Sequence, residues 1–387
     1  MIKAPNTIGC TRSRIRLTLL ISASLLGFAS HASAVAPISD DSELFVTANV
    51  SASENDNLFL SHANATSAIV YDIAPGLSYE FGKNNALTSG QLAYWEDFQI
   101  FSKFGSRLNN QLANVVFWTK YDDAKNKLNV DASYHQADQA QVGIQNLSFL
   151  VNRDLYHVDA LGEVSVTEKT SLGAGVAYDD TNYQTAGYTD YRYTEVPVNY
   201  YFKVEPKLDL SAGFRYRDNT LGAGGIDSTD YFYNVGLRGE LTPLLTGQFN
   251  VGYQEEKLVN RTKQDSLGLD SNFNYACDPK TSLTLGLISD YGYAAVGSAF
   301  RNSGINLGVT SALNDQWSLR GQVGYNRYAY ITTAQKDNYY SGQLGISYLV
   351  NVHVTVGATY TYGQDNSNIT LDSFKNNIFS VSGSLHF

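Results

Sequence analysis

The sequence predicts an all-β protein: a transmembrane antiparallel up-and-down β-barrel of about 18 strands (16 to 18), preceded by a cleaved signal peptide. Three observations predict this fold. Apolar and polar residues alternate with a period of two, in a pattern that repeats roughly every 35 to 45 residues. Tyrosine recurs at a similar distance after short polar turns, and the chain ends in an alternating strand that closes on phenylalanine.

The composition excludes several other classes of protein. Only 17% of the 387 residues are charged, against about 25% in an average soluble domain, whereas 13% are aromatic, with 28 Tyr among them. No stretch of 18 apolar residues is present, which excludes spanning helices. With 32 Gly, 7 Pro and 2 Cys, the chain is neither collagen-like, nor Pro-rich and disordered, nor a disulfide scaffold.

The N-terminus predicts secretion. Residues 1–34 contain a basic region (Arg12, Arg14 and Arg16), an apolar stretch over 17–28 and an Ala-Ser-Ala cleavage site at 32–34. The mature chain, residues 35–387, is then expected in the outer membrane of a Gram-negative cell. Cleavage removes four basic residues and no acid from a chain whose net charge is already -10. Nucleic acid is therefore not expected as a partner.

Short polar turns divide the mature chain into strand pairs. After most turns the alternation resumes and runs into Tyr, as in Leu128, Val130, Ala132 and Tyr134. Eight short turns and nine longer Gly-, Asn- and Ser-rich connections give 18 strands. The short turns fall at 82–85, 122–126, 168–169, 205–207, 242–243, 278–280, 314–315 and 351.

One apolar face per strand suits a soluble sandwich as well as a membrane barrel. The even strand count, with all short turns on one side, favours the barrel. Six to eight residues separate turn and Tyr, a rise of roughly 15–20 Å in a tilted strand, which would put Tyr at the lipid headgroups. The last strand, residues 379–387 (FSVSGSLHF), resembles the terminal strand of outer-membrane barrels. In those barrels a C-terminal Phe, here Phe387, is recognised by the assembly machinery.

Two prolines and one long connection need separate interpretation. Pro75 and Pro197 fall inside predicted strands, where they mark either bulges or an error of register. Residues 136–153 form the connection long enough to fold into the lumen, and are the preferred candidate for a constriction.

The face opposite the apolar one carries charges of both signs. These residues either keep the bore wet and pair across strands, or set selectivity at a constriction. Tyr201 and Phe232 fall on the same inward side, and Trp95 is a further candidate. The candidate pore-lining residues are Asp131, Asp159, Glu163, Glu195, Asp209, Arg215, Arg217, Arg238, Asp270, Asp290 and Arg320.

Three segments carry a family resemblance: residues 51–59 (SASENDNLF), the Tyr-rich hairpins at 190–193 (DYRY) and 210–218 (LSAGFRYRD), and the terminal strand. Together they resemble the putative β-barrel porin 2 family, over nearly all of the mature chain. The resemblance implies an outer-membrane barrel, often associated with exopolysaccharide export. It also implies polysaccharide and periplasmic export proteins as partners, beside outer-membrane lipid and the assembly machinery.

No catalytic or cofactor motif accompanies these features. The sequence contains no Gly-x-Ser-x-Gly elbow, no H-E-x-x-H, no Walker A motif and no Cys/His spacing for a metal. We therefore expect neither an enzyme nor a cofactor. Three functions remain open: a passive conduit for a secreted polysaccharide, a general small-solute porin, or a filled barrel that acts as an adhesin, receptor or structural protein.

Overall fold

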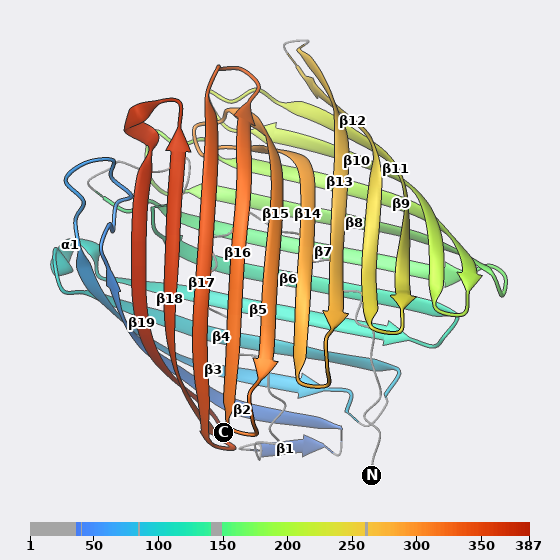
Figure 1. Ribbon diagram of the computed structural model, residues 1–387, viewed down its shortest axis with the longest axis horizontal. Coiled ribbons are helices and arrows are strands. Elements are labelled where there is room, and N and C mark those ends of the chain that lie inside the picture. The colour runs from blue at the N-terminus through green and yellow to red at the C-terminus, as the bar shows by residue number, and fades with distance from the viewer. Residues whose placement is uncertain (1–35, 40, 84–85, 141–148, 260–261) are drawn as a thin grey trace.

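One antiparallel sheet closes on itself to form the barrel (Figure 1). The computed structural model describes residues 36–39, 41–83, 86–140, 149–259 and 262–387. In these residues each strand from β2 to β19 pairs with the next, and β19 pairs with β2, from Ile378 opposite Asn55 to His386 opposite Thr47. The predicted closed barrel of 18 strands is confirmed. Its strands are β2 (Ser42–Asn55), β3 (Ala68–Phe81), β4 (Thr88–Phe101), β5 (Asn110–Asp122), β6 (Asn126–Asp138), β7 (Asn152–Ser165), β8 (Thr170–Tyr183), β9 (Tyr191–Glu205), β10 (Leu208–Leu221), β11 (Ser228–Thr242), β12 (Leu245–Leu258), β13 (Lys263–Ala276), β14 (Thr281–Tyr293), β15 (Ala299–Ala312), β16 (Trp317–Tyr330), β17 (Lys336–Asn351), β18 (Val354–Ser367) and β19 (Phe374–His386).

A nineteenth, short strand covers the place where the chain ends. β1 (Ala36–Ser39) pairs with the first residues of β2, beginning with Ala36 opposite Leu44. Just beyond, the backbone groups of Val46 and Phe387 exchange hydrogen bonds of 2.7 and 2.9 Å. The edge of β2 that extends past the C-terminus is therefore paired, as a sheet edge in lipid requires. The predicted signal peptide, residues 1–34, lies outside the described residues.

The connections alternate in length as the turn pattern predicts. Eight short turns lie at one end of the barrel and nine longer loops at the other. The helix α1 (Gly105–Leu108) and the 3-10 turn η1 (Thr370–Asp372) belong to longer loops, at the end we call the loop end. No helix in the described part of the chain is long and apolar enough to cross a bilayer.

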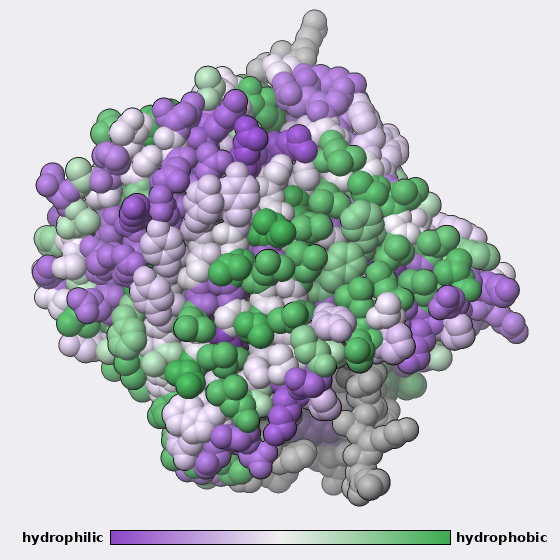
Figure 2. All heavy atoms as spheres, in the orientation of Figure 1, coloured by the Kyte–Doolittle hydropathy of each residue, from purple (hydrophilic) through white to green (hydrophobic). Residues whose placement is uncertain are grey.

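The outer face of the barrel is apolar, with aromatic residues near its edges. Figure 2 shows apolar side chains gathered over the middle of the strands and polar ones toward the loop end. Near the loop end, tyrosines meet across neighbouring strands: Tyr233 lies opposite Tyr253, and Tyr134 opposite Tyr156 with ring centroids 4.9 Å apart. Such a belt marks the level of the lipid headgroups. Its exposed members on the outer face include Tyr71, Tyr94, Tyr156, Tyr178, Tyr233, Tyr253, Tyr340 and Tyr360.

Pro75 and Pro197 shift no register. Pairing of β3 with β4 stops at Ile73 opposite Phe98 and resumes in the same register at Gly76. Pro197 interrupts the pairing of β8 with β9 in the same way. Each proline removes ladder hydrogen bonds on one side of its strand, because it has no N–H to donate, and neither produces a bulge.

Candidate functional site

The eleven charged residues predicted to line the pore lie on strands, at the positions that alternate with the exposed apolar residues. The structure brings seven of them into two separate groups. We call Glu195, Arg215, Arg217 and Asp290, with Asp230, the upper cluster, and Glu163, Asp209 and Arg238 the lower cluster. On β10 the two clusters are six residues apart at their closest, from Asp209 to Arg215, roughly 20 Å along the strand.

Strand pairing builds one side of the upper cluster. Arg215 and Arg217 are two residues apart on β10, so their side chains leave the same face. Arg217 lies directly opposite Glu195 on β9 and opposite Asp230 on β11. Its Nε donates a short hydrogen bond to Asp230, whose side chain is fully buried. Neighbouring strands thus supply two acids to two arginines.

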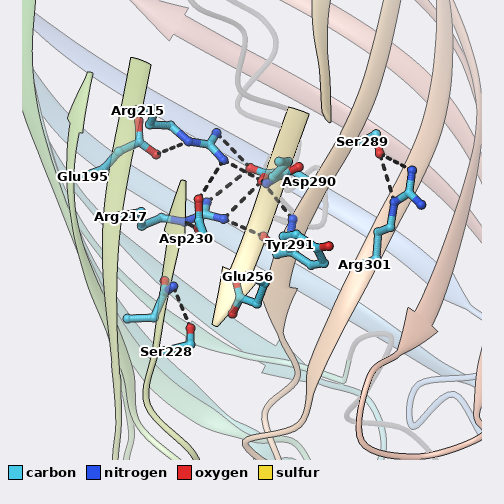
Figure 3. A network of polar contacts seen from close by, with 12 residues as sticks. Glu195, Arg215, Arg217, Ser228, Asp230, Glu256, Ser289, Asp290, Tyr291 and Arg301 are labelled. Atoms are coloured by element: carbon cyan, nitrogen blue, oxygen red, sulfur yellow. Dashed lines mark hydrogen bonds and ion pairs between the residues drawn. The ribbon is translucent and has the colours of Figure 1, made fainter. Parts of the chain in front are cut away.

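The other side of the upper cluster reaches across the lumen. Asp290 lies on β14, four strands from β10, and points back toward both arginines (Figure 3). Its Oδ1 lies 2.8 Å from Arg215 Nη2 and 3.1 Å from Arg217 Nη2. Arg217 Nη2 also donates to the carbonyl of Tyr291 at 3.1 Å. These contacts form a chord across the interior, made of charge-assisted hydrogen bonds.

Polar side chains from β12 and β14 and an aromatic ring from β11 surround this chord. Gln254 donates a short hydrogen bond to Asp290, and the hydroxyl of Tyr293 donates to Glu256 Oε1 at 2.6 Å. Gln254 and Glu256 are almost fully buried. Arg215 lies over the ring of Phe232, at 5.3 Å from its centroid. The arginines are therefore held from several directions, which restrains the chord.

The lower cluster forms a second chord nearer the short turns. Arg238 on β11 binds Glu163 on β7 with two hydrogen bonds, of 2.7 and 2.8 Å, and Asp209 on β10 at 3.1 Å. The guanidinium lies 3.3 Å from the ring centroid of Tyr201 on β9. Gly173 on β8 leaves room for that ring, because a Cβ there would lie 3.1 Å from Tyr201 Cε2. Tyr201 thus lies on the inner face, as its position in the strand predicts.

A cavity of about 340 Å³ lies in the interior beside the upper cluster. Its walls combine the charged chord with amide and aromatic side chains, and it extends to β6 on one side and to β13 and β14 on the other. A volume of this size accommodates a small ligand, since binding cavities commonly span about 300–1,000 Å³. The lining includes His135, Arg153, Tyr193, Asn199, Arg215, Phe232, Asn234, Gln254, Asp270, Asp290 and Phe300.

The loop end is covered by a packed apolar cluster, which we call the lid. The lid joins loops from opposite sides of the barrel: the β4–β5 loop contributes Leu108, and the β14–β15 loop contributes Ala294. Beside it the β8–β9 and β14–β15 loops also meet, since the backbone N–H of Thr189 donates to the carbonyl of Ala295 at 2.8 Å. Its buried members are Leu58, Phe59, Leu60, Ala68, Phe101, Leu108, Ala140, Leu150, Ala294, Phe300, Tyr328 and Phe374.

The remaining predicted pore residues lie outside both clusters. Asp131 on β6 is directly opposite Asp159 on β7, Asp270 on β13 lines the cavity, and Arg320 lies on β16. The predicted constriction at residues 136–153 is described only at its ends, because 141–148 lie outside the described residues. The described parts of this connection include the buried Ala140 and Leu150 of the lid.

Sequence reasoning missed several residues of the site. Asp230 and Glu256 occupy the inward positions of β11 and β12, so extending the alternation to the ends of these strands would have found them. No comparable signal marks the lid, since its loops are rich in polar residues. Among the described residues, no group of three His, Cys, Asp or Glu side chains could hold a metal ion.

Comparison with known proteins gives a family match for the second half of the barrel. Residues 225–387 match the family described as "Putative beta-barrel porin 2", which confirms the predicted resemblance over β11 to β19. Asp230, Glu256 and Asp290 lie within the matched range, whereas Glu195, Arg215 and Arg217 precede it. No curated protein matches the chain.

Solved structures with a similar fold are outer-membrane proteins and transporters of low sequence identity. OpdK from Pseudomonas aeruginosa is 11% identical, with a TM-score of 0.47, over 90% of this chain and 99% of that one. OccAB3 from Acinetobacter baumannii is 10% identical, with a TM-score of 0.46, over 90% and 100%. The FrpB iron transporter from Neisseria meningitidis is 10% identical, with a TM-score of 0.46, and 85% of this chain spans 62% of its length.

Proposed function

We propose that this porin-like outer-membrane β-barrel channel, whose residues 225–387 match the β-barrel porin 2 family, is a passive conduit for a secreted polysaccharide. The observation that carries the proposal is the interior itself. Two charged chords and a polar, aromatic-lined cavity lie inside a closed barrel, beneath a lid in which loops from different sides of the barrel pack together.

The chemistry of the cavity suits a polyhydroxylated solute. Asn199, Asn234 and Gln254 offer amide groups that both donate and accept hydrogen bonds, as sugar hydroxyls do. Tyr193 and Phe232 add aromatic surface. Because Arg215 and Arg217 are matched by acids, the upper cluster presents no large charge of one sign to the solute.

A small-solute diffusion porin is the second candidate, and the size of the cavity favours it. A volume of about 340 Å³ holds a small molecule but not an extended polymer, unless the chords separate. The packed lid favours a third candidate, a filled barrel that acts as an adhesin, receptor or structural protein. In that case the lid stays closed.

Conductance in planar bilayers separates these functions. The full chain is compared with Phe59→Ser/Phe374→Ser, which weakens the lid, and with Leu371→Ser, an exposed residue of the β18–β19 loop three positions before Phe374, as the matched control. We expect current through the wild type and through Leu371→Ser, and at least as much current through the lid variant. A linear neutral oligosaccharide should block the current transiently.

The other outcomes point elsewhere. A current that single sugars cross freely, and that the oligosaccharide leaves unchanged, identifies a small-solute porin. If neither the wild type nor the lid variant conducts, the barrel is no conduit and the filled-barrel function takes its place.

A further inference from the structure

The wall of the barrel is interrupted between β13 and β14. Their pairing begins at Ala276 opposite Ser282, near the short turns, and ends at Leu269 opposite Ser289. Beyond that point, residues 263–268 pair with β12 and residues 290–293 pair with β15, but not with each other. We call this interruption the seam. Figure 1 shows the ends of β13 and β14 diverging there.

Side chains replace backbone pairing along the seam. Tyr291 donates from its hydroxyl to the carbonyl of Gln264 at 3.1 Å, and Ser289 Oγ donates to the carbonyl of Leu267 at 2.8 Å. Arg301 on β15 reaches over from the outer face and contacts both Ser289 Oγ, at 2.9 Å, and the carbonyl of Leu267, at 3.2 Å. Three side chains thus latch two strands that share no ladder here.

The position of the seam explains why a barrel in lipid tolerates it. Leu267 lies directly opposite Tyr253, a member of the aromatic belt near the loop end. The unpaired backbone therefore begins at the headgroup level and continues outward, where water can satisfy it. An opening at this height meets the polar layer of the membrane rather than its hydrocarbon.

The interior cavity reaches the seam from the other side. Its lining includes Leu269 to Ser271 on β13 and Leu287 to Tyr293 on β14, the residues that flank the lower end of the seam. Asp290, at the start of the unpaired stretch, is held inward by Arg215 and Arg217. The upper cluster therefore holds this end of β14 on the lumen side, together with the bonds from Arg217 to the carbonyl of Tyr291 and from Tyr293 to Glu256.

A second, shorter interruption in the described wall lies between β5 and β6, whose pairing stops at Asn114 opposite His135. There Gln136 accepts directly from the backbone N–H of Ala113 at 3.0 Å. That interruption is closed from strand to strand and needs no side chain from a third strand. The β13–β14 seam is the longer of the two, and its closure includes a side chain from a third strand, Arg301.

We infer that the seam is the exit of the conduit: a hydrophilic chain leaves the lumen sideways, between β13 and β14, into the headgroup layer. This inference rests on the proposed function. Opening the lid exposes a cluster of twelve buried residues to water, whereas opening the seam exposes the ring of Tyr291 and breaks a few polar contacts that water can replace. The lateral route is therefore the less costly one.

Two cross-linked variants distinguish the routes, both in a Cys277→Ser background because Cys277 is exposed. Gln264→Cys/Tyr291→Cys spans the seam, and Thr189→Cys/Ala295→Cys joins the β8–β9 and β14–β15 loops beside the lid, which we call the lid link. A short bifunctional thiol reagent joins each pair, and a reductant releases it. We expect the seam link to reduce the current at least tenfold and the reductant to restore it, while the lid link leaves the current unchanged.

The opposite pattern, conduction through the seam-linked protein and block by the lid link, overturns the lateral exit and leaves the conduit intact. Tyr291→Phe, which removes one hydrogen bond of the latch, should lengthen openings, and unchanged openings also count against the exit. If no variant conducts, including the wild type and Tyr291→Phe, the proposed conduit itself fails and the exit with it.

Discussion

The hydroxyl of Tyr291 is bound to the backbone carbonyl of Gln264, 3.1 Å away, in a part of the wall where the strands of these two residues share no ladder pair. The outer face of the barrel here is closed by a side chain instead of by the sheet. Tyr291 is buried although it occupies an outward position on β14. That burial shows that its ring fills the space between the strands.

Amide hydrogen exchange should reveal the seam. Amides within 263–268 and 290–293 that point toward the seam should exchange about fivefold faster than amides of the same stretches that point toward β12 and β15. A missing hydrogen bond with a net value of about 1 kcal/mol produces a difference of this order. NMR of the protein in micelles measures both sets, and the amides on the paired side are the internal control. Equal protection on both sides would contradict an unpaired seam.

Asp290→Asn should weaken the chord across the lumen. The substitution removes the acid that Arg215 and Arg217 share, and partly buried arginines lose a charge partner. We expect a loss of about 2–3 kcal/mol in the free energy of unfolding in urea, and a reversal potential shifted toward anion selectivity. Asp265→Asn, on the outer face of β13 and half exposed, is the control. The chord has no structural role if both variants unfold alike.

Gly173→Ala should disturb the lower cluster through Tyr201. The new Cβ would lie 3.1 Å from Tyr201 Cε2, so the ring must shift beneath the Arg238 guanidinium. We expect a destabilisation of about 1–3 kcal/mol, typical of overpacking, measured from the midpoint of unfolding. Gly162→Ala on the paired strand β7 is the matched control, because its nearest neighbour would lie 3.8 Å away. Identical midpoints would show that Tyr201 is not confined.

The β5–β6 turn should confer stability that depends on pH. Hydrogen bonds from Asn126, and from the backbone of Lys125, lower the pKa of Asp123 from 3.8 to about 2. A lowered pKa means that the carboxylate stabilises the folded barrel above its ordinary pKa, and that this contribution is lost as the pH falls from 3.8 toward 2. In Asp123→Asn the urea midpoint of unfolding should vary less with pH over that interval than it does in the wild type. Asp315→Asn, in the β15–β16 turn, should show the same dependence of the midpoint on pH as the wild type.

Cys277 gives a direct test of orientation and processing. It is exposed in the β13–β14 turn, at the end opposite the lid. If the short turns face the periplasm, a membrane-impermeant maleimide should label permeabilised cells and spare intact ones. The β14–β15 loop variant Val296→Cys, in a Cys277→Ser chain, should label in intact cells. Labelling of Cys277 in intact cells would show that the short turns face the outside of the cell instead. The intact mass of the labelled protein checks whether the mature chain begins at Val35.

The alternation of apolar and polar residues predicts most of the barrel, because the apolar positions of each strand identify the face that meets lipid. The eight short turns and the inward positions of Arg215, Arg217 and Asp290 follow from that pattern. Their contact with one another does not. Asp290 meets the arginines only because the cross-section of the barrel brings β14 toward β10, a relationship that no local sequence pattern records.

The lid and the seam have a similar origin. Leu58, Phe59 and Leu60 lie in a loop whose polar neighbours indicate exposure, and they become buried only when loops from other strands cover them. The seam lies between two strands that each alternate normally, so the sequence of β13 and of β14 separately predicts a continuous ladder. Both features depend on contacts between distant parts of the wall.

The side chain of Asn57, just after the first long strand, donates to the carbonyl of Lys375 in the last one at 2.8 Å. Phe59 and Phe374 enter the same apolar cluster from these two ends of the chain. Such contacts cannot form while the barrel is still an open sheet, since its first and last strands are then far apart. Burial of these residues is therefore a late event in biogenesis. The lid can pack only after the barrel has closed.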